Sequence, residues 1–136
     1  MAVTNLATVP VADTAYGQLA INDEVNVGEI VTEATTEEVV RSYFSDIPVL
    51  VQIARCESQF RHTLADGTIL RGSVDPADTG VMQINKRYHA KKAVELGLNL
   101  DEIHGNMAYA RYLYKTKGTS PWNASAPCWG RTIAMR

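Results

Sequence analysis

The stretch "IARCESQF", residues 53–60, ends an apolar run with a glutamate, Glu57. The preceding apolar residues follow the i, i+3, i+4 spacing of one helix face, namely Leu50, Ile53 and Ala54. Glu57 is the next member of this stripe, so we expect it on the core-facing side of a helix. Partial burial raises a carboxyl pKa, which keeps the group protonated for use as a general acid. The alternative is a structural glutamate paired with Arg61.

Capping signals predict two helices in this part of the chain. Thr35, with Glu38 three residues further on, forms a capping box before a short helix. Asp46 is expected to cap the helix that contains Glu57. Pro48 is tolerated in the first turn of that helix, because the first backbone N–H groups have no partner within the helix.

The second half of the chain mixes breakers with helical segments. Residues 61–80 contain four breakers and predict a loop or a small hairpin: Gly67, Gly72, Pro76 and Gly80. Asn85 is expected to cap a helix over about 86–95, and a longer helix is expected to start at Asn99 and end near Lys117. The final segment is expected to be irregular. The predicted fold class is therefore mostly α, a helical domain with a small irregular or hairpin lobe.

The net charge of −2 over 136 residues combines two unlike parts. Residues 1–38 hold seven acids and no Lys or Arg, whereas residues 39–136 hold eight acids and 13 bases, about +5. We therefore predict an acidic arm over residues 1–34, extended or partly disordered, followed by a folded domain over residues 35–136. A basic domain attracts polyanions such as nucleic acid or a bacterial cell wall. The alternative is that the charge split reflects only two differently solvated surfaces with no polyanionic partner.

No apolar stretch approaches the ~20 residues of a membrane-spanning helix. The N-terminus lacks the basic start and apolar centre of a signal peptide, so we expect that any export signal was removed or never present. The two cysteines, Cys56 and Cys128, are either buried thiols or one long-range disulfide. A loop of about 70 residues closed in this way would be stabilised by roughly 4 kcal/mol.

Two segments, in this order, resemble a known family. "ARCESQF", residues 54–60, contains the pair Glu57–Ser58, and "GVMQIN", residues 80–85, follows some twenty residues later. The chain resembles the lysozyme-like superfamily, in particular the soluble lytic transglycosylase domain. In that family a glutamate in such a pair ends a helix.

A third block of the family is matched more loosely. Asn106 and "ARYL", residues 110–113, occupy its place, but Tyr109 stands where the family prefers a small side chain. The resemblance covers about residues 45–129. It implies an α+β lysozyme-like fold with an active-site cleft.

The resemblance implies cleavage of the β-1,4 bond between N-acetylmuramic acid and N-acetylglucosamine in peptidoglycan. Glu57 would act first as general acid and then as base, which closes a 1,6-anhydro ring without a second carboxylate. The implied partner is the peptidoglycan glycan strand, and a monomer is expected. We expect no cofactor and no metal, because no ligand spacing occurs among the histidines His62, His89 and His104. We expect no nucleic-acid partner, because no such motif is present.

The same resemblance implies substrate-binding residues around Glu57: Ser58, Met82, Gln83, Ile84, Asn85, Asn106, Tyr112 and Trp122. Gln83 and the backbone of residues 82–84 would bind N-acetyl groups, and Ser58 would orient Glu57. The family's "A-Y-N-A-G" block is missing here. Three aromatic residues are candidates for its sugar contact: Tyr112, Tyr114 and Trp122.

A second carboxylate would change the reaction. Asp78, two residues before Gly80, is similar in position to the second catalytic carboxylate of animal-type lysozymes. The alternative function is therefore a hydrolytic muramidase that uses Glu57 and Asp78. If Asp78 has no catalytic role, we expect it to cap the loop. Asp75 and Asp66 are weaker candidates. A catalytically silent glycan-binding module is a further alternative.

The cysteines extend the resemblance. Cys56 before the glutamate and the terminal "PWNASAPCW", residues 121–129, resemble the resuscitation-promoting-factor branch of the superfamily. This implies a Cys56–Cys128 disulfide that clamps the C-terminal segment beside the active-site helix. It also implies an oxidising compartment, so the expected location is secreted, periplasmic or cell-wall associated.

Overall fold

The computed structural model describes residues 32–134 of the chain, and side chains up to residue 131. The chain divides into two units, Met1–Glu33 and Ala34–Arg136, and the elements described here belong to the second unit. The predicted acidic arm over residues 1–34 falls almost wholly outside the described residues and stays a prediction.

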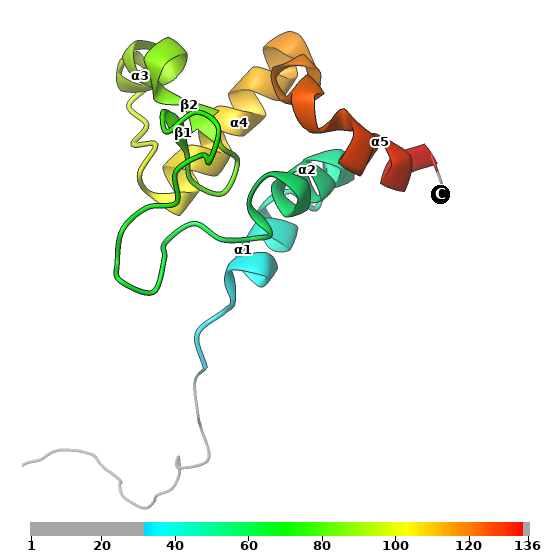
Figure 1. Ribbon diagram of the computed structural model, residues 1–136, viewed down its shortest axis with the longest axis horizontal. Coiled ribbons are helices and arrows are strands. Elements are labelled where there is room, and N and C mark those ends of the chain that lie inside the picture. Colours follow the sequence, from blue (N-terminus) through cyan, green and yellow to red (C-terminus); the bar gives the residue numbers. More distant parts are fainter. Residues whose placement is uncertain (1–31, 135–136) are drawn as a thin grey trace, which may run out of the picture. The chain divides into compact units, whose positions relative to one another are not determined.

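The elements follow one another from the short helix α1 to the C-terminal helix α5 (Figure 1): α1 Thr36–Tyr43, α2 Pro48–Ser58, β1 Asp78–Thr79, β2 Ile84–Asn85, α3 Lys86–Glu95, α4 Ile103–Lys117, the 3₁₀ helix η2 Ser120–Ser125 and α5 Ala126–Ala134. The described region is thus mostly helical with one small sheet, which confirms the predicted mostly α class. No helix among residues 32–134 is both long and apolar enough to cross a bilayer.

The capping box of α1 is confirmed. The Glu38 backbone N–H donates to Thr35 Oγ1 at 3.1 Å, and the Thr35 N–H donates to Glu38 Oε1 at 3.0 Å. Two backbone donors at the start of the helix are thereby satisfied by side chains from the helix itself. The local sequence therefore marks the residue at which α1 begins.

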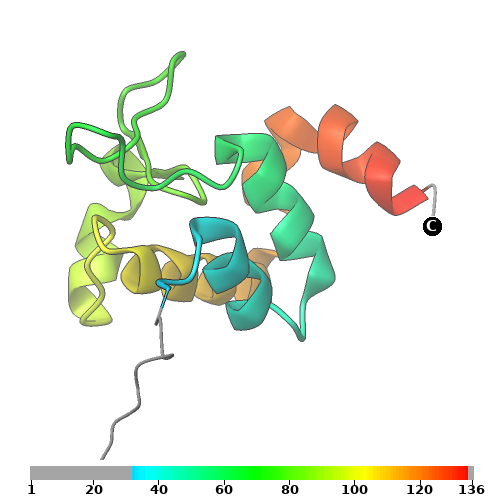
Figure 2. The ribbon, with the colours of Figure 1, turned by 90° about the horizontal axis from the view of Figure 1, so that it is seen from below.

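The start of α2 corrects one prediction. Its N-cap is Ile47, which makes no side-chain capping bond, and Pro48 occupies the first turn as expected. Asp46 instead forms an ion pair with Arg111 of α4, with Arg111 Nη1 2.7 Å from Asp46 Oδ2. The Arg111 guanidinium also lies 4.9 Å from the centre of the Tyr43 ring, so α1 packs beside α4 (Figure 2). A long-range partner thus removes Asp46 from its local capping role.

Helix α3 begins where the sequence indicates, and α4 does not. Asn85 Oδ1 accepts a hydrogen bond from the Arg87 backbone N–H at 2.9 Å, which confirms the cap of α3. The predicted start of α4 at Asn99 is wrong, since α4 begins at Ile103. Asn99 folds into a turn whose backbone presses against Gly105, where an added Cβ would clash with it. This close approach places the turn outside the helix.

A short hairpin joins the helices α2 and α3. Strands β1 and β2 pair antiparallel, with Asp78 opposite Asn85 and Thr79 opposite Ile84. Isolated bridges also join Thr63 to Ile69 and Arg71 to Thr79, so the breaker-rich segment folds into a small lobe of loops and hairpin, as predicted.

Polar contacts from the interior hold the turn between β1 and β2. Asn106, fully buried on α4, accepts from the Met82 backbone N–H at 2.9 Å and donates to the Thr79 carbonyl at 2.9 Å. Gly80 has a φ of +77°, and a Cβ there would lie 2.6 Å from Asn106 Nδ2 and from His62 Cε1. Only glycine fits this position.

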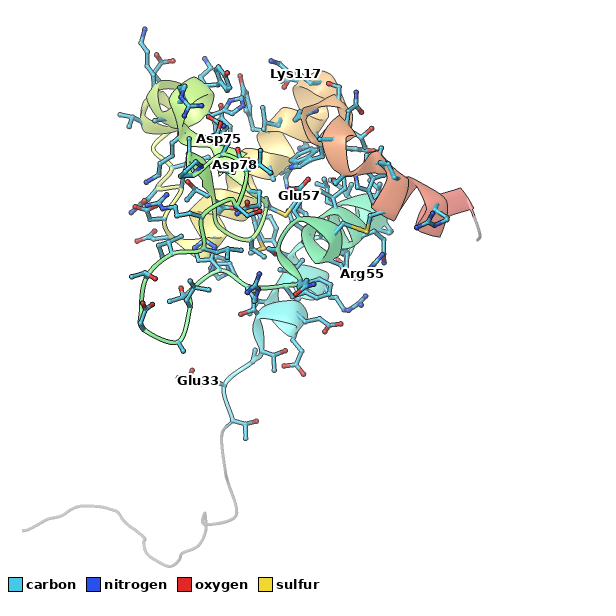
Figure 3. All side chains as sticks on the ribbon, in the orientation of Figure 1. Glu33, Arg55, Glu57, Asp75, Asp78 and Lys117 are labelled. Carbon is cyan, nitrogen blue, oxygen red and sulfur yellow. A yellow bond between two sulfur atoms is a disulfide. The ribbon has the colours of Figure 1, made fainter. Side chains whose placement is uncertain are left out.

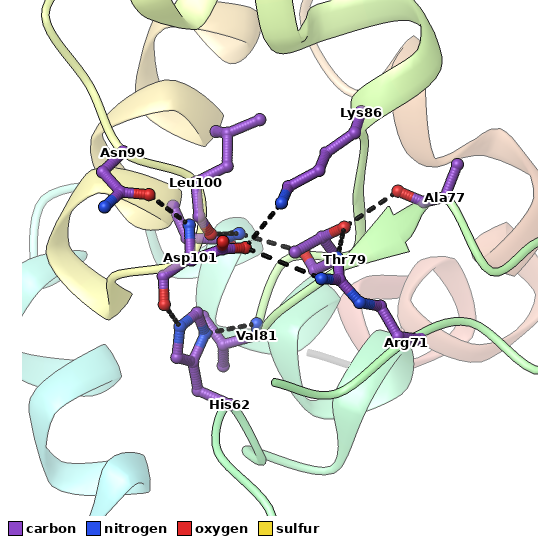
Figure 4. A network of polar contacts seen from close by, with 10 residues as sticks. His62, Arg71, Ala77, Thr79, Val81, Lys86, Asn99, Leu100 and Asp101 are labelled. Carbon is purple, nitrogen blue, oxygen red and sulfur yellow. Dashed lines mark hydrogen bonds and ion pairs between the residues drawn. The ribbon is translucent and has the colours of Figure 1, made fainter. Parts of the chain in front are cut away.

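His62 completes the anchoring of that turn (Figure 4). Its Nδ1 accepts from the Val81 backbone N–H at 3.0 Å, and its Nε2 lies 2.8 Å from the Asp101 carbonyl oxygen. Because one neighbour is a donor and the other an acceptor, the imidazole is neutral with its proton on Nε2. Burial lowers the pKa of His62. Asp101 also forms an ion pair with Lys86, at 2.8 Å between Oδ1 and Nζ.

The C-terminal segment corrects a third prediction. It is helical, as η2 and α5, and not irregular. The indole Nε1 of the buried Trp122 donates to the Met82 carbonyl at 3.0 Å, which ties η2 to the hairpin. The predicted disulfide is present: Cys56 of α2 and Cys128 of α5 are bonded, with 6.1 Å between their Cα atoms. The disulfide therefore holds α5 beside α2.

One hydrophobic core underlies these contacts. Its largest fully buried apolar side chains come from the α1 region, α2, the hairpin and α4: Val40, Phe44, Leu50, Ile53, Met82, Ile84, Met107 and Tyr109. Leu50 and Ile53 belong to the stripe seen in the sequence, so α2 buries the face that leads to Glu57.

Candidate active site

A cavity of about 390 Å³ opens beside the end of α2. Six residues that the sequence singles out line it: Glu57, Asp78, Gln83, Ile84, Asn85 and Trp122. They come from α2, the hairpin and η2, so segments far apart in the chain form one wall (Figure 3). The tertiary structure thus collects both candidate carboxyl groups at a single cavity.

Glu57 is partly buried in the wall of this cavity. Burial raises its pKa, a hydrogen bond from Ser125 lowers it, and the charge of Asp78 raises it, with a net upward shift. The predicted direction of the shift is confirmed. Among the ion pairs of the described residues, none joins Glu57 to Arg61, whose Nε donates to the Ser58 carbonyl oxygen at 3.0 Å.

Ser125 is the residue that bonds Glu57. Its hydroxyl lies 2.6 Å from Glu57 Oε2 and 3.1 Å from the Trp122 carbonyl oxygen. The Trp129 indole N–H donates to Ser125 Oγ at 3.0 Å and fixes its position. A single hydroxyl proton serves one acceptor at a time. It can donate to Glu57 when the carboxyl is ionised and turn to Trp122 when Glu57 is protonated, so the site accommodates both states.

Three of the predicted substrate contacts are buried in the core next to the cavity. Ser58, Met82 and Asn106 are each exposed by 1% or less, and none lines the cavity. The Ser58 hydroxyl donates to the Ala54 carbonyl at 3.0 Å, so Ser58 does not orient Glu57 as predicted. A buried side chain with satisfied bonds shapes the wall and does not meet a ligand directly.

Asp78 faces the same cavity as Glu57 and is held by the hairpin. Asn85 Nδ2 donates to Asp78 Oδ1 at 2.8 Å and to Asp75 Oδ2 at 2.9 Å. These bonds orient the Asp78 carboxylate across the strand pair in which Asp78 stands opposite Asn85. Asp78 is thereby fixed near Glu57, where its negative charge can act on positive charge that develops in the cavity.

The two weaker acidic candidates have structural partners instead. Asp75 forms a bidentate ion pair with Arg87, with 2.7 Å between Arg87 Nη1 and Asp75 Oδ2. These hydrogen bonds hold the pKa of the Asp75 carboxyl below its usual range. Asp66 accepts bonds from the hydroxyl and backbone N–H of Thr68, which lower its pKa. Neither residue lines the cavity. Both serve loop geometry.

Several cavity residues were missed by the sequence reasoning: Tyr88, His89, Leu113, Lys117, Ser120 and Pro121. They lie on α3, at the end of α4 and at the start of η2. Leu113 and Pro121 belong to segments that the sequence singles out, but neither was predicted as a site residue. Tyr112, predicted as a sugar contact, lines a neighbouring cavity and not this one. Ser125 was also missed, although its place three residues before Cys128 could have indicated a position beside Glu57.

Among the described residues, no group of three or more His, Cys, Asp and Glu side chains is arranged to hold a metal ion. Glu57 and Asp78 are the carboxyl groups that line the cavity, and a carboxyl of raised pKa such as Glu57 can transfer a proton. Comparison with protein-family models, with curated proteins and with solved structures finds no match to this chain.

Proposed function

We propose that this protein cleaves the β-1,4 bond between N-acetylmuramic acid and N-acetylglucosamine in peptidoglycan, as a lytic transglycosylase with a lysozyme-like fold. The observation that carries the proposal is Glu57, a partly buried carboxyl of raised pKa in the wall of a 390 Å³ cavity. A raised pKa is the property that a general acid needs near neutral pH. The resemblance of residues 54–60 and 80–85 to the transglycosylase blocks supplies the substrate class.

In the proposed reaction, protonated Glu57 donates its proton to the glycosidic oxygen while the bond to the muramyl C1 breaks. The electron pair of the broken bond stays on the leaving oxygen, and positive charge develops at C1. Glu57, now ionised, is stabilised by the hydrogen bond from Ser125 Oγ at 2.6 Å. It then takes the proton of the 6-hydroxyl of the same sugar, whose oxygen bonds C1 and closes the 1,6-anhydro ring. Glu57 ends protonated, ready for another cycle.

Hydrolysis by the same glutamate is the second candidate, and the placement of Asp78 favours it. Asp78 lines the cavity with Glu57 and is oriented by Asn85 at 2.8 Å. As a carboxylate it could activate a water molecule or bond C1, which are the roles of the second acid in glycosidases. In a transglycosylase the same charge would only stabilise the developing cation. The reaction product separates the two.

The disulfide supports a location outside the cytoplasm. Structural disulfides persist in oxidising compartments, and the Cys56–Cys128 bond joins the two segments that carry Glu57 and Ser125. A secreted, periplasmic or wall-associated enzyme would meet its substrate in such a compartment. The predicted monomeric state belongs to the same proposal.

The test is digestion of purified peptidoglycan by the wild type and by Glu57→Gln, followed by mass spectrometry of the soluble products. We expect 1,6-anhydromuramic ends from the wild type and none from the variant. Glu37→Gln, which removes an exposed carboxyl on α1, is the matched control and should match the wild type. Circular dichroism of each variant reports folding.

Each other outcome has a definite meaning. Reducing ends that have gained water would replace the transglycosylase with a hydrolase, and Asp78→Asn should then also abolish turnover. No products from a folded wild type that still binds glycan would make it a silent binding module. A Glu57→Gln protein that fails to fold would assign Glu57 a structural role.

A further inference from the structure

A second cavity, of about 490 Å³, adjoins the first. The two share four lining residues: Tyr88, His89, Leu113 and Lys117. The shared wall lies on α3 and α4, and the second cavity extends to Lys92, Tyr109 and Tyr112 on the same two helices. The space beside Glu57 therefore continues into a groove, which we call the α3–α4 groove.

The α3–α4 groove is electropositive. Its charged lining residues are Lys92 and Lys117, and no aspartate or glutamate lines it. The charge of Lys92 is partly balanced by Glu95, at 3.3 Å between Nζ and Oε1. Among the described side chains, none forms an ion pair with Lys117, whose ammonium stands at the end of α4 (Figure 3).

Aromatic side chains line the α3–α4 groove together with Lys117. The His89 Nδ1 lies 2.9 Å from the hydroxyl of the buried Tyr109, and the two rings are 5.3 Å apart. The Tyr109 ring lies 5.4 Å from the Tyr112 ring. Burial and the charge of Lys117 both lower the pKa of His89. His89 is therefore neutral, and an anion bound beside Lys117 would meet one full positive charge. The aromatic rings of Tyr109 and Tyr112 lie in the same groove.

Other cations near the cavity do not compete for this role. Two bases at the start of α3 have acidic partners: Lys86 pairs with Asp101 at 2.8 Å and Arg87 with Asp75 at 2.7 Å. Lys117 is also the lysine that lines both cavities. A charged substituent of a glycan that passes Glu57 would meet Lys117 in the same cavity.

We propose that the α3–α4 groove binds a carboxylate carried by a substituent of the glycan, with Lys117 as its cationic contact. This inference rests on the proposed function and adds a specificity contact to it: Lys117 favours muramyl glycans that carry a free carboxylate over neutral N-acetylglucosamine polymers. Two substituents of muramic acid offer such a carboxylate: the lactyl group itself, when no peptide is attached, and the peptide stem. Both present the same anion to the same cation.

The test measures equilibrium binding by calorimetry, with the full chain in a Glu57→Gln background so that no ligand is consumed. Three ligands of equal sugar length are compared: a muramyl glycan with peptide stems, the same glycan after enzymatic removal of the stems, and a neutral N-acetylglucosamine oligomer. Each is titrated against the parent and against Lys117→Gln, Lys117→Arg and Lys115→Gln. Lys115 lines neither cavity and lies on the same helix, so it is the matched charge control.

We expect Lys117→Gln to weaken binding of an acidic glycan by roughly tenfold, the usual worth of a charge-assisted hydrogen bond, and to leave the neutral oligomer unchanged. Lys117→Arg should restore most of the affinity, and Lys115→Gln should have no effect. Loss confined to the peptide-bearing ligand would assign the carboxylate to the stem. Loss confined to the glycan without stems would assign it to the lactyl group, and loss with both acidic ligands would mean that Lys117 binds either carboxylate.

Two results would overturn the inference alone: equal weakening of all three ligands, or no weakening of any ligand that binds. A parent protein that binds none of the three would refute the proposed function, and this inference with it. The neutral oligomer and the Lys115→Gln control keep these outcomes apart.

Discussion

Removing the disulfide should destabilise the protein by about 4 kcal/mol. Cys56 and Cys128 are separated by 72 positions, and the chain-entropy model gives about 4 kcal/mol at 25 °C for a loop of that length. A domain of this size has a total unfolding free energy of about 5–15 kcal/mol. The Cys56→Ala, Cys128→Ala double variant should therefore retain little stability.

The site should respond before the rest of the fold. Cys56 directly precedes Glu57, and Cys128 follows Ser125 by three residues on adjoining helical segments. Without the bond, α5 is held beside α2 by packing alone. The Glu57–Ser125 contact and the packing of Trp122 and Trp129 should loosen, which changes the tryptophan fluorescence.

The assay is urea unfolding of the double variant and of the wild type, with and without reductant, followed by circular dichroism and tryptophan fluorescence. Reductant should lower the free energy of unfolding of the wild type toward that of the variant and leave the variant unchanged. A loss below about 1 kcal/mol would refute the entropic reasoning. A response of the variant to reductant would expose an effect unrelated to the disulfide.

Two further predictions concern protonation. Ser125→Ala removes the hydrogen bond that lowers the pKa of Glu57. The alkaline limb of the kcat/KM profile against pH should therefore move to higher pH, and Ser125→Thr should move it less. An alkaline limb that does not move in Ser125→Ala would exclude Ser125 from the site. His62 has a lowered pKa in the folded state, so the stability from its neutral form is complete above about pH 6.5 and is lost as the pH falls further. The unfolding free energy of His62→Gln should fall less steeply below that pH than that of the exposed His104→Gln control, and equal slopes would contradict the role of the bond to Val81.

Local sequence was enough to predict those features that neighbouring residues decide. The Thr35–Glu38 box and the Asn85 cap are made within three residues, so their side chains find the same partners in almost any context. The apolar stripe of α2 likewise predicts the burial of Glu57, because helical spacing alone sets which face a residue shares. The mostly α class follows from these signals.

Features that depend on distant partners were missed or wrong. Asp46 caps nothing because Arg111 binds it, and the helix expected at Asn99 starts later because the turn packs on Gly105. The C-terminal segment is helical because Trp122 and the disulfide dock it. Each of these contacts joins positions that no local pattern connects.

The same division holds at the cavity. The sequence by itself determined that Glu57 ends a buried helix face and that Asp78 is a candidate beside it. Only the tertiary structure decided that Ser125 bonds Glu57, that Asn85 holds Asp78 and that Lys117 stands between two cavities. A helix or strand fixes its own faces through backbone geometry, whereas a site depends on which faces meet, and that is set by packing across the whole domain.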